Sequence, residues 1–114
     1  MEVHPRVFVS SISTDAWRSD PEVGSGAEEH VLSDTGTMRA GLTRFNGSGS
    51  PDPVSWVLPQ DEVLLVLEGA VRIEIESGPT LDLKPGDMAS LPKGAVTRWH
   101  LTLPFKEMWV LAGS

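Results

Sequence analysis

Glu62 is the side chain in this sequence that is best suited to acid–base chemistry. It directly precedes an apolar run at residues 63–67, and it is expected to point into a pocket lined by apolar and aromatic side chains. Desolvation raises the pKa of a carboxyl group in such surroundings, and a pKa near neutrality suits a general acid or base. We therefore predict a catalytic role for Glu62. The alternative is structural: a cap at a strand end, or an ion pair with Arg39 or Arg44.

Six further side chains are expected to share the pocket with Glu62, because side chains alternate between the two faces of a strand. Tryptophan rings can stack on a flat or cationic ligand, although the simpler role for them is to fill the core. A concave and mostly apolar site with a few polar groups suits a small molecule. We predict substrate contacts from Trp56, Leu58, Thr97, Trp99, Glu107 and Trp109.

The strands that must position these groups are predicted mainly at residues 55–103. Four short apolar runs are separated there by Gly and Pro turn signals, which indicates an all-β barrel or sandwich. Val71, Ile73 and Ile75 alternate with charged side chains, as in a strand with one buried face. The unbroken apolar run at residues 63–67 predicts a strand that is buried on both faces.

The chain length predicts one domain, residues 1–114, with an N-terminal arm and loops at residues 1–37 and a barrel core at residues 38–112. The loop at residues 46–53 is either a solvated connection or a lid over the pocket. Strands are predicted at residues 6–12, 28–32, 38–45, 96–103 and 105–112, the last two joined at Pro104; residues 13–34 otherwise form a loop, with one helical turn at residues 15–18.

The fixed residues of this segment resemble those of the cupin superfamily. Glu62 and Gly69 match the last two fixed positions of the first cupin motif with the right gap, and Gly86, Pro92 and Gly94 match the first three of the second. The resemblance covers roughly the C-terminal half of the chain. It implies a single jelly-roll barrel, a double-stranded β-helix, and a homodimer in which an N-terminal strand often pairs with the partner.

The positions that hold metal in cupins carry other residues in this sequence. Trp56, Leu58 and Thr97 stand where the resemblance implies the three histidine ligands, so that only Glu62 remains. One carboxylate does not make a transition-metal site, and we predict neither metal nor other cofactor. An irregular metal site remains as an alternative, built from Glu62 with His4, His30, His100 or Glu107, although His100 is expected to point outward.

A smaller group of cupins shares more of the pattern. The sequence is similar to small cupins related to (S)-ureidoglycine aminohydrolase and to the ethanolamine-utilisation cupins, a resemblance that also allows Lys106 a place at the pocket rim. Because members of this group differ in chemistry and in metal use, the resemblance does not identify a substrate. The residues that carry it are Trp56, Glu62, Glu68, Gly69, Gly86, Asp87, Pro92, Gly94, Trp99 and Lys106.

Composition excludes several classes of function. The formal net charge of −7 disfavours nucleic acid and anionic membrane surfaces as partners. The sequence has no cysteine, which excludes disulfides and thiol chemistry. The N-terminal residues lack a basic stretch followed by an apolar one, and no apolar run approaches membrane length, so we expect a cytoplasmic protein.

Three hypotheses about function follow. The first is a metal-independent enzyme of isomerase, lyase or cyclase type, which uses Glu62 as acid or base on a small molecule held between Trp56 and Trp99. The second is a barrel that binds a small molecule without chemistry, as a sensor or accessory protein. The third is a metal-dependent cupin with an irregular site.

Overall fold

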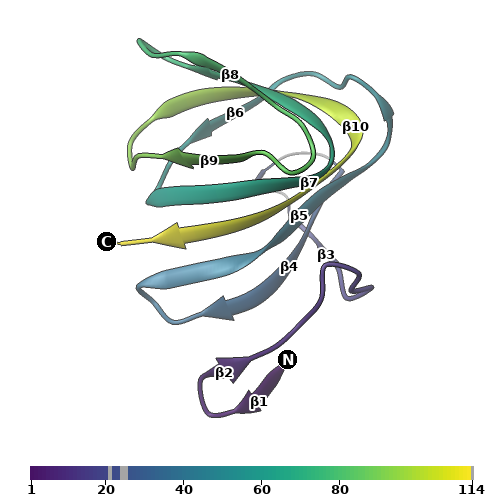
Figure 1. Ribbon diagram of the computed structural model, residues 1–114, viewed down its shortest axis with the longest axis vertical. Helices are drawn as coiled ribbons and strands as arrows, with labels where there is room; N and C mark the ends of the chain where they lie inside the picture. Colours follow the sequence, from purple (N-terminus) through teal and green to yellow (C-terminus); the bar gives the residue numbers. More distant parts are fainter. Residues whose placement is uncertain (21, 24–25, 114) are drawn as a thin grey trace.

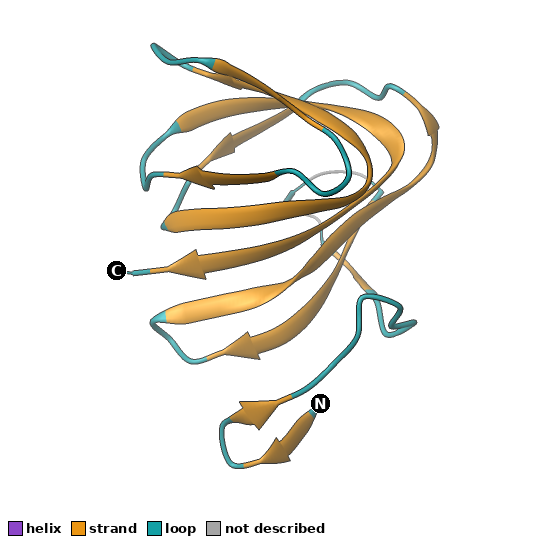
Figure 2. Ribbon diagram, in the orientation of Figure 1, coloured by secondary structure: helices purple, strands orange, loops and turns teal. Residues whose placement is uncertain are grey.

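The computed structural model describes residues 1–20, 22–23 and 26–113, and the described residues form strands and loops without a helix (Figures 1 and 2). This confirms the all-β prediction, and it corrects the helical turn expected at residues 15–18. Pro21 and Gly24, which helped to predict the loop at residues 13–34, lie outside the described residues. The strands are β1 (Glu2–His4), β2 (Val7–Phe8), β3 (Arg18–Ser19), β4 (Ala27–Asp34), β5 (Met38–Gly49), β6 (Val54–Val57), β7 (Asp61–Ile75), β8 (Thr80–Leu83), β9 (Met88–Leu91) and β10 (Val96–Ala112).

Two long strands, β7 and β10, organise the main sheet. They pair with each other along most of their length, and the described strands around them follow the order β3-β4-β5-β10-β7-β8. β6 pairs with the first part of β10, and β9 pairs with the first part of β7. Every pairing is antiparallel, and the sheet curls around a single interior, as expected for a jelly-roll barrel.

The alternation of side chains along β7 decides what fills the barrel. Leu64 and Val66 are fully buried, whereas Val63 between two inward residues is 48% exposed. The prediction that residues 63–67 are buried on both faces is therefore wrong, because on the outer face Val63 is exposed and Leu65 and Leu67 are only partly buried. The inward residues of β7 lie opposite inward residues of β10, with Glu62 opposite Leu111 and Leu64 opposite Trp109.

The C-terminal part of the chain is one long strand rather than two. β10 continues through Pro104, where its pairing with β7 is interrupted between Thr102 and Lys106. A proline has no N–H to give to a ladder, and it lies in the interrupted stretch, so the strand does not need to end there. Gly69 of β7 faces this stretch with a φ of 77°, and a Cβ atom at Gly69 would collide with the Pro104 carbonyl oxygen.

The N-terminal residues divide between the barrel and a separate hairpin. β4 pairs with β5 along its length, so the sheet begins before the core boundary that was predicted at residue 38. The strand predicted at residues 6–12 is limited to Val7–Phe8, which forms with β1 a hairpin beside the main sheet (Figure 1). In the described part of the chain, no helix has the length and apolarity to cross a membrane.

The segment predicted as a loop at residues 46–53 is partly strand. β5 runs on to Gly49, which lies opposite Leu103 of β10, because the long β10 extends the ladder beyond the predicted end of this strand. Ser50 and Pro51 line a second pocket, together with residues of β7, β8 and β10. No residue from 46 to 53 lines the internal cavity described below, which favours a connection over a lid for this segment.

Candidate functional site

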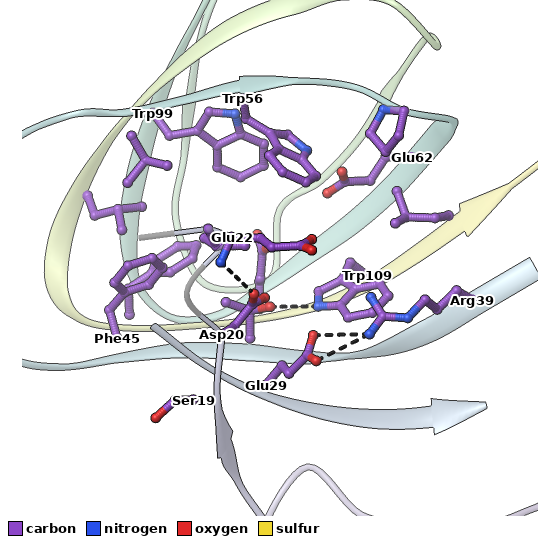
Figure 3. Close-up of a pocket in the computed structure, with 18 of the residues that line it drawn as sticks. Ser19, Asp20, Glu22, Glu29, Arg39, Phe45, Trp56, Glu62, Trp99 and Trp109 are labelled. Carbon is purple, nitrogen blue, oxygen red and sulfur yellow. Dashed lines mark hydrogen bonds and ion pairs between the residues drawn. The ribbon is translucent and has the colours of Figure 1, made fainter. Parts of the chain in front are cut away.

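The barrel interior opens into a cavity of about 620 Å³ (Figure 3). Its walls combine aromatic rings with an unusual number of ionisable groups. The cavity is lined by Arg18, Ser19, Asp20, Glu22, Val23, Glu29, Arg39, Thr43, Phe45, Val54, Trp56, Pro59, Gln60, Glu62, Trp99, Leu101, Phe105, Glu107, Trp109 and Leu111. Among the predicted contact residues, Trp56, Trp99, Glu107 and Trp109 line this cavity together with Glu62, whereas Leu58 and Thr97 do not.

Glu62 has the environment that was expected from its position. It is buried near the start of β7, and desolvation raises the pKa of its carboxyl group to about 7, an effect that a hydrogen bond from the Trp56 side chain partly opposes. The proposed ion pair with Arg39 or Arg44 is absent, since Arg39 contacts Glu29 and Arg44 contacts Glu28. Figure 3 shows the Glu62 carboxylate turned toward the cavity beneath Trp56.

Glu107 is a second carboxyl group in the same cavity. It comes from β10, it is only 7% exposed, and its Oε2 atom has no hydrogen-bond partner. Desolvation, with a further contribution from the charge of Glu62, raises the pKa of Glu107 well above its ordinary value. Two carboxyl groups that influence each other in an apolar site resist simultaneous ionisation, so that at least one proton stays on the pair near neutral pH.

The tryptophans that flank Glu62 are held by a shared hydroxyl group. Thr97 Oγ1 donates to the Trp56 carbonyl oxygen at 2.5 Å and accepts a hydrogen bond from Trp99 Nε1 at 2.7 Å. Thr97 therefore helps to position Trp56 and Trp99, and its buried hydroxyl group both donates and accepts a hydrogen bond. Leu58 is almost completely buried and packs in the core. We correct the prediction of direct substrate contact for both residues, because neither reaches the cavity surface.

An ionic cluster forms the wall opposite Trp56 and Trp99 (Figure 3). Glu29 of β4 accepts from Arg18 Nη2 at 2.8 Å, and Arg39 Nη2 lies 3.2 Å from each of the two Glu29 carboxylate oxygens. The Arg39 guanidinium group also lies 5.3 Å from the ring centre of Trp109, whose Nε1 donates to Thr43. Alternation along residues 27–34 was the signal that could have placed Glu29 in the cavity.

Asp20, Glu22 and Val23, which follow β3, line one side of the cavity. Asp20 lies there, and partial burial together with the nearby charge of Glu29 raises the pKa of its carboxyl group. This segment follows Trp17, whose ring centre lies 4.2 Å from the Arg44 guanidinium carbon and 5.7 Å from the Lys106 ammonium nitrogen. Lys106 also donates to the Ile12 carbonyl oxygen, so it holds the N-terminal segment and does not line the cavity.

The cavity does not offer the ligands of a transition metal. Among the described residues, no group of three or more His, Cys, Asp or Glu side chains is arranged to hold a metal ion. His30 contacts Ser10 and the Ala16 carbonyl oxygen, and it lies away from Glu62. His100 lies 3.1 Å from Glu74, and His4 is exposed on β1. The irregular site of Glu62 with histidines is thus not formed, and the indole, aliphatic and hydroxyl side chains at the three cupin ligand positions, Trp56, Leu58 and Thr97, do not fit a metal.

Comparisons with known proteins agree with this architecture. Residues 33–107 match the family model described as the EutQ-like cupin domain. The chain is 31% identical over 93 residues to acetate kinase EutQ of Escherichia coli (strain K12), a match that covers 75% of this chain and 38% of that protein. It is 33% identical over 78 residues to acetate kinase EutQ of Salmonella typhimurium LT2, which covers 61% of this chain and 32% of that protein.

A solved structure of a EutQ protein also matches this chain. The crystal structure of an ethanolamine utilization protein Q from Salmonella typhimurium LT2 superposes with a TM-score of 0.63 at 26% identity, and the match covers 76% of this chain and 69% of that chain. The chain thus spans well under half the length of the curated relatives that it matches, 38% and 32%.

Proposed function

The chain belongs to the EutQ-like cupin domain family, and from that premise we propose that it catalyses proton transfer on a small molecule inside the barrel. The reaction is of isomerase, lyase or cyclase type. The observation that carries the proposal is Glu62, a buried carboxyl group with a pKa of about 7 that lines an aromatic cavity. A group with such a pKa is present in both protonation states at neutral pH, as a catalytic acid–base requires.

Glu107 supports the same chemistry from the neighbouring strand. Its raised pKa keeps it protonated when Glu62 is ionised, so that the pair can offer a base and an acid to one substrate. Isomerisation, elimination and cyclisation need a proton removed at one atom and supplied at another. Two coupled carboxyl groups that hold a proton between them meet that requirement without a metal or another cofactor.

The acetate kinase named among the relatives is a less favoured activity for this chain. Transfer of a phosphoryl group from a nucleotide needs positive charge around the phosphates. Five carboxylic acids line the described cavity, and both of its arginines already contact Glu29. Gly47 and Gly49 do not form a phosphate-binding loop, since they belong to strand β5 and no helix follows.

Isotope exchange tests the proposal on many candidate substrates at once. The protein is incubated in D₂O with pools of compact metabolites, and proton NMR reports C–H signals that exchange or disappear. We expect the rate of exchange or of product formation to rise with pH, with the midpoint of the rise near pH 7, because Glu62 ionises there. In the Glu62→Gln variant the rate should fall by about 100-fold or more, because the amide cannot accept the proton.

The exposed carboxylate at Glu76 provides a matched control, and Glu76→Gln should exchange at the wild-type rate. A metal chelator should leave the rate unchanged, and a loss of activity on its addition would favour a metal-dependent reaction instead. An undiminished rate in Glu62→Gln would refute the proposal. A metabolite that saturates the tryptophan fluorescence but shows neither exchange nor product would identify the barrel as a binding module.

A further inference from the structure

Acidic groups in the cavity outnumber the basic groups that are free to balance them. Arg18 and Arg39, the two basic side chains of the cavity, both contact Glu29. Their positive charge is thus placed on a single carboxylate. No cationic side chain of the described residues pairs with Asp20, Glu62 or Glu107. Each of these three carboxyl groups has a raised pKa because burial penalises its charge, and positive charge brought from outside would relieve that penalty.

One carboxyl oxygen of Glu107 lacks a hydrogen-bond donor. Its Oε2 atom is buried without a hydrogen-bond partner, although the side chain lines the cavity. A buried carboxyl oxygen without a partner costs free energy that a ligand N–H group would recover. A ligand carboxylate would instead meet Glu62 and Glu107 as like charges, and a hydrocarbon would leave the oxygen without a partner.

Aromatic surface completes the environment of a cation. Trp56 and Trp99 line the same cavity as the two carboxyl groups, and the Trp99 indole N–H is already bound to Thr97. The indole ring attracts cations that approach its face, and Arg39 already lies 5.3 Å from the ring centre of Trp109 within the same site. Rings and carboxyl groups together favour an amine that carries an organic body.

We propose that the cavity takes a compact organic ammonium compound, whose protonated amine donates N–H groups to Glu107 and Glu62 and whose body lies against Trp56 and Trp99. This inference rests on the proposed function, and it names the substrate class. Because the carboxyl pair holds protons when no cation is present, binding of the ammonium group releases a proton from the pair. The other ionisable groups that line the cavity with Glu62 are Arg18 of β3, Asp20 and Glu22 after β3, Glu29 of β4, Arg39 of β5 and Glu107 of β10.

Four probes that share one ring and differ in charge test the inference on the full chain. They are benzylammonium, benzyltrimethylammonium, benzyl alcohol and benzoate, titrated by calorimetry and by tryptophan fluorescence. Benzylammonium should bind about tenfold or more tightly than the other three, since it alone combines a positive charge with N–H donors. Its affinity should rise by up to about tenfold per pH unit below neutrality and level off above it, as expected for release of one proton.

Glu107→Gln should lower the affinity for benzylammonium by about tenfold or more and leave that for benzyl alcohol unchanged, whereas the exposed control Glu76→Gln should change neither. If Glu107→Gln fails to fold, as circular dichroism would show, Glu62→Gln serves as the second variant with the same expected loss. Tighter binding of benzoate or benzyl alcohol, equal binding of benzyltrimethylammonium, a pH-independent affinity, or no binding by any probe would overturn the inference.

The two proposals can fail separately. Isotope exchange on a neutral or anionic metabolite that depends on Glu62 would overturn the ammonium substrate and support proton transfer. Selective binding of benzylammonium without exchange on any amine would support the cation site and count against catalysis.

Discussion

The Glu62 carboxyl group couples the chemistry of the cavity to the stability of the barrel. In the folded protein its pKa is about 7, compared with an ordinary value of 4.5. The folded state therefore holds a proton at this site that the unfolded chain has lost between these two pH values. Stability should fall as pH rises from 4.5 to 7, and the loss should remain above pH 7, with a magnitude of about 3 kcal/mol.

Glu62→Gln isolates this effect, because an amide of similar shape stays neutral at every pH. We expect the variant to match the wild type near pH 4.5 and to melt at a higher temperature than the wild type at pH values above about 7. Thermal unfolding across that pH range measures the difference. The exposed Glu76→Gln should show no such divergence, and a constant difference between Glu62→Gln and wild type would contradict the expectation.

Part of the cavity could be predicted residue by residue, and part could not. Alternation along two strands placed Glu62, Trp99 and Trp109 inward, since the period of a strand is local information. Glu29 was missed although the alternation along β4 is local information, whereas Asp20 was missed because it reaches the cavity only when the residues after β3 fold against the sheet. That placement depends on contacts such as those of Trp17, which join residues far apart in sequence.

At the level of elements, the close approach of β7 and β10 places a strict demand on Gly69. Its φ of 77° is unfavourable for other residues, and a Cβ atom would in addition collide with the Pro104 carbonyl oxygen. Gly69→Ala should lower the free energy of unfolding by more than about 2 kcal/mol, as measured by urea denaturation.

Gly36 separates the two causes of this loss. Its φ is 90°, but no atom lies within 4 Å of the Cβ position, so Gly36→Ala should lose only about 1 kcal/mol from backbone strain. Equal losses in the free energy of unfolding of the two variants would show that the close contact with β10 does not add to the cost at Gly69. The sequence marked Gly69 as a fixed position of the cupin pattern, but it could not show which strand lies against it.

For the whole molecule, we propose that two copies associate through the N-terminal hairpin. Several apolar side chains of the hairpin and the following residues face solvent, among them Val7 at 49% exposed. Among the described strands, β1 and β2 pair only with each other, and a lone two-stranded hairpin is marginally stable. Light scattering should give twice the chain mass of 12.3 kDa, and Val7→Asp should shift the protein toward the monomer. A monomeric wild type at micromolar concentration would contradict the proposal.

The place of β10 in the sheet has a consequence for how the chain folds. β5 and β7 do not pair with each other, because β10 lies between them and joins them from the far end of the sequence. The order of synthesis is thus not the order of assembly: the earlier strands keep open edges until residues 96–112 are available. Folding should accordingly be slow for a chain of this size, limited by long-range loop closure, and most prone to aggregation before β10 docks.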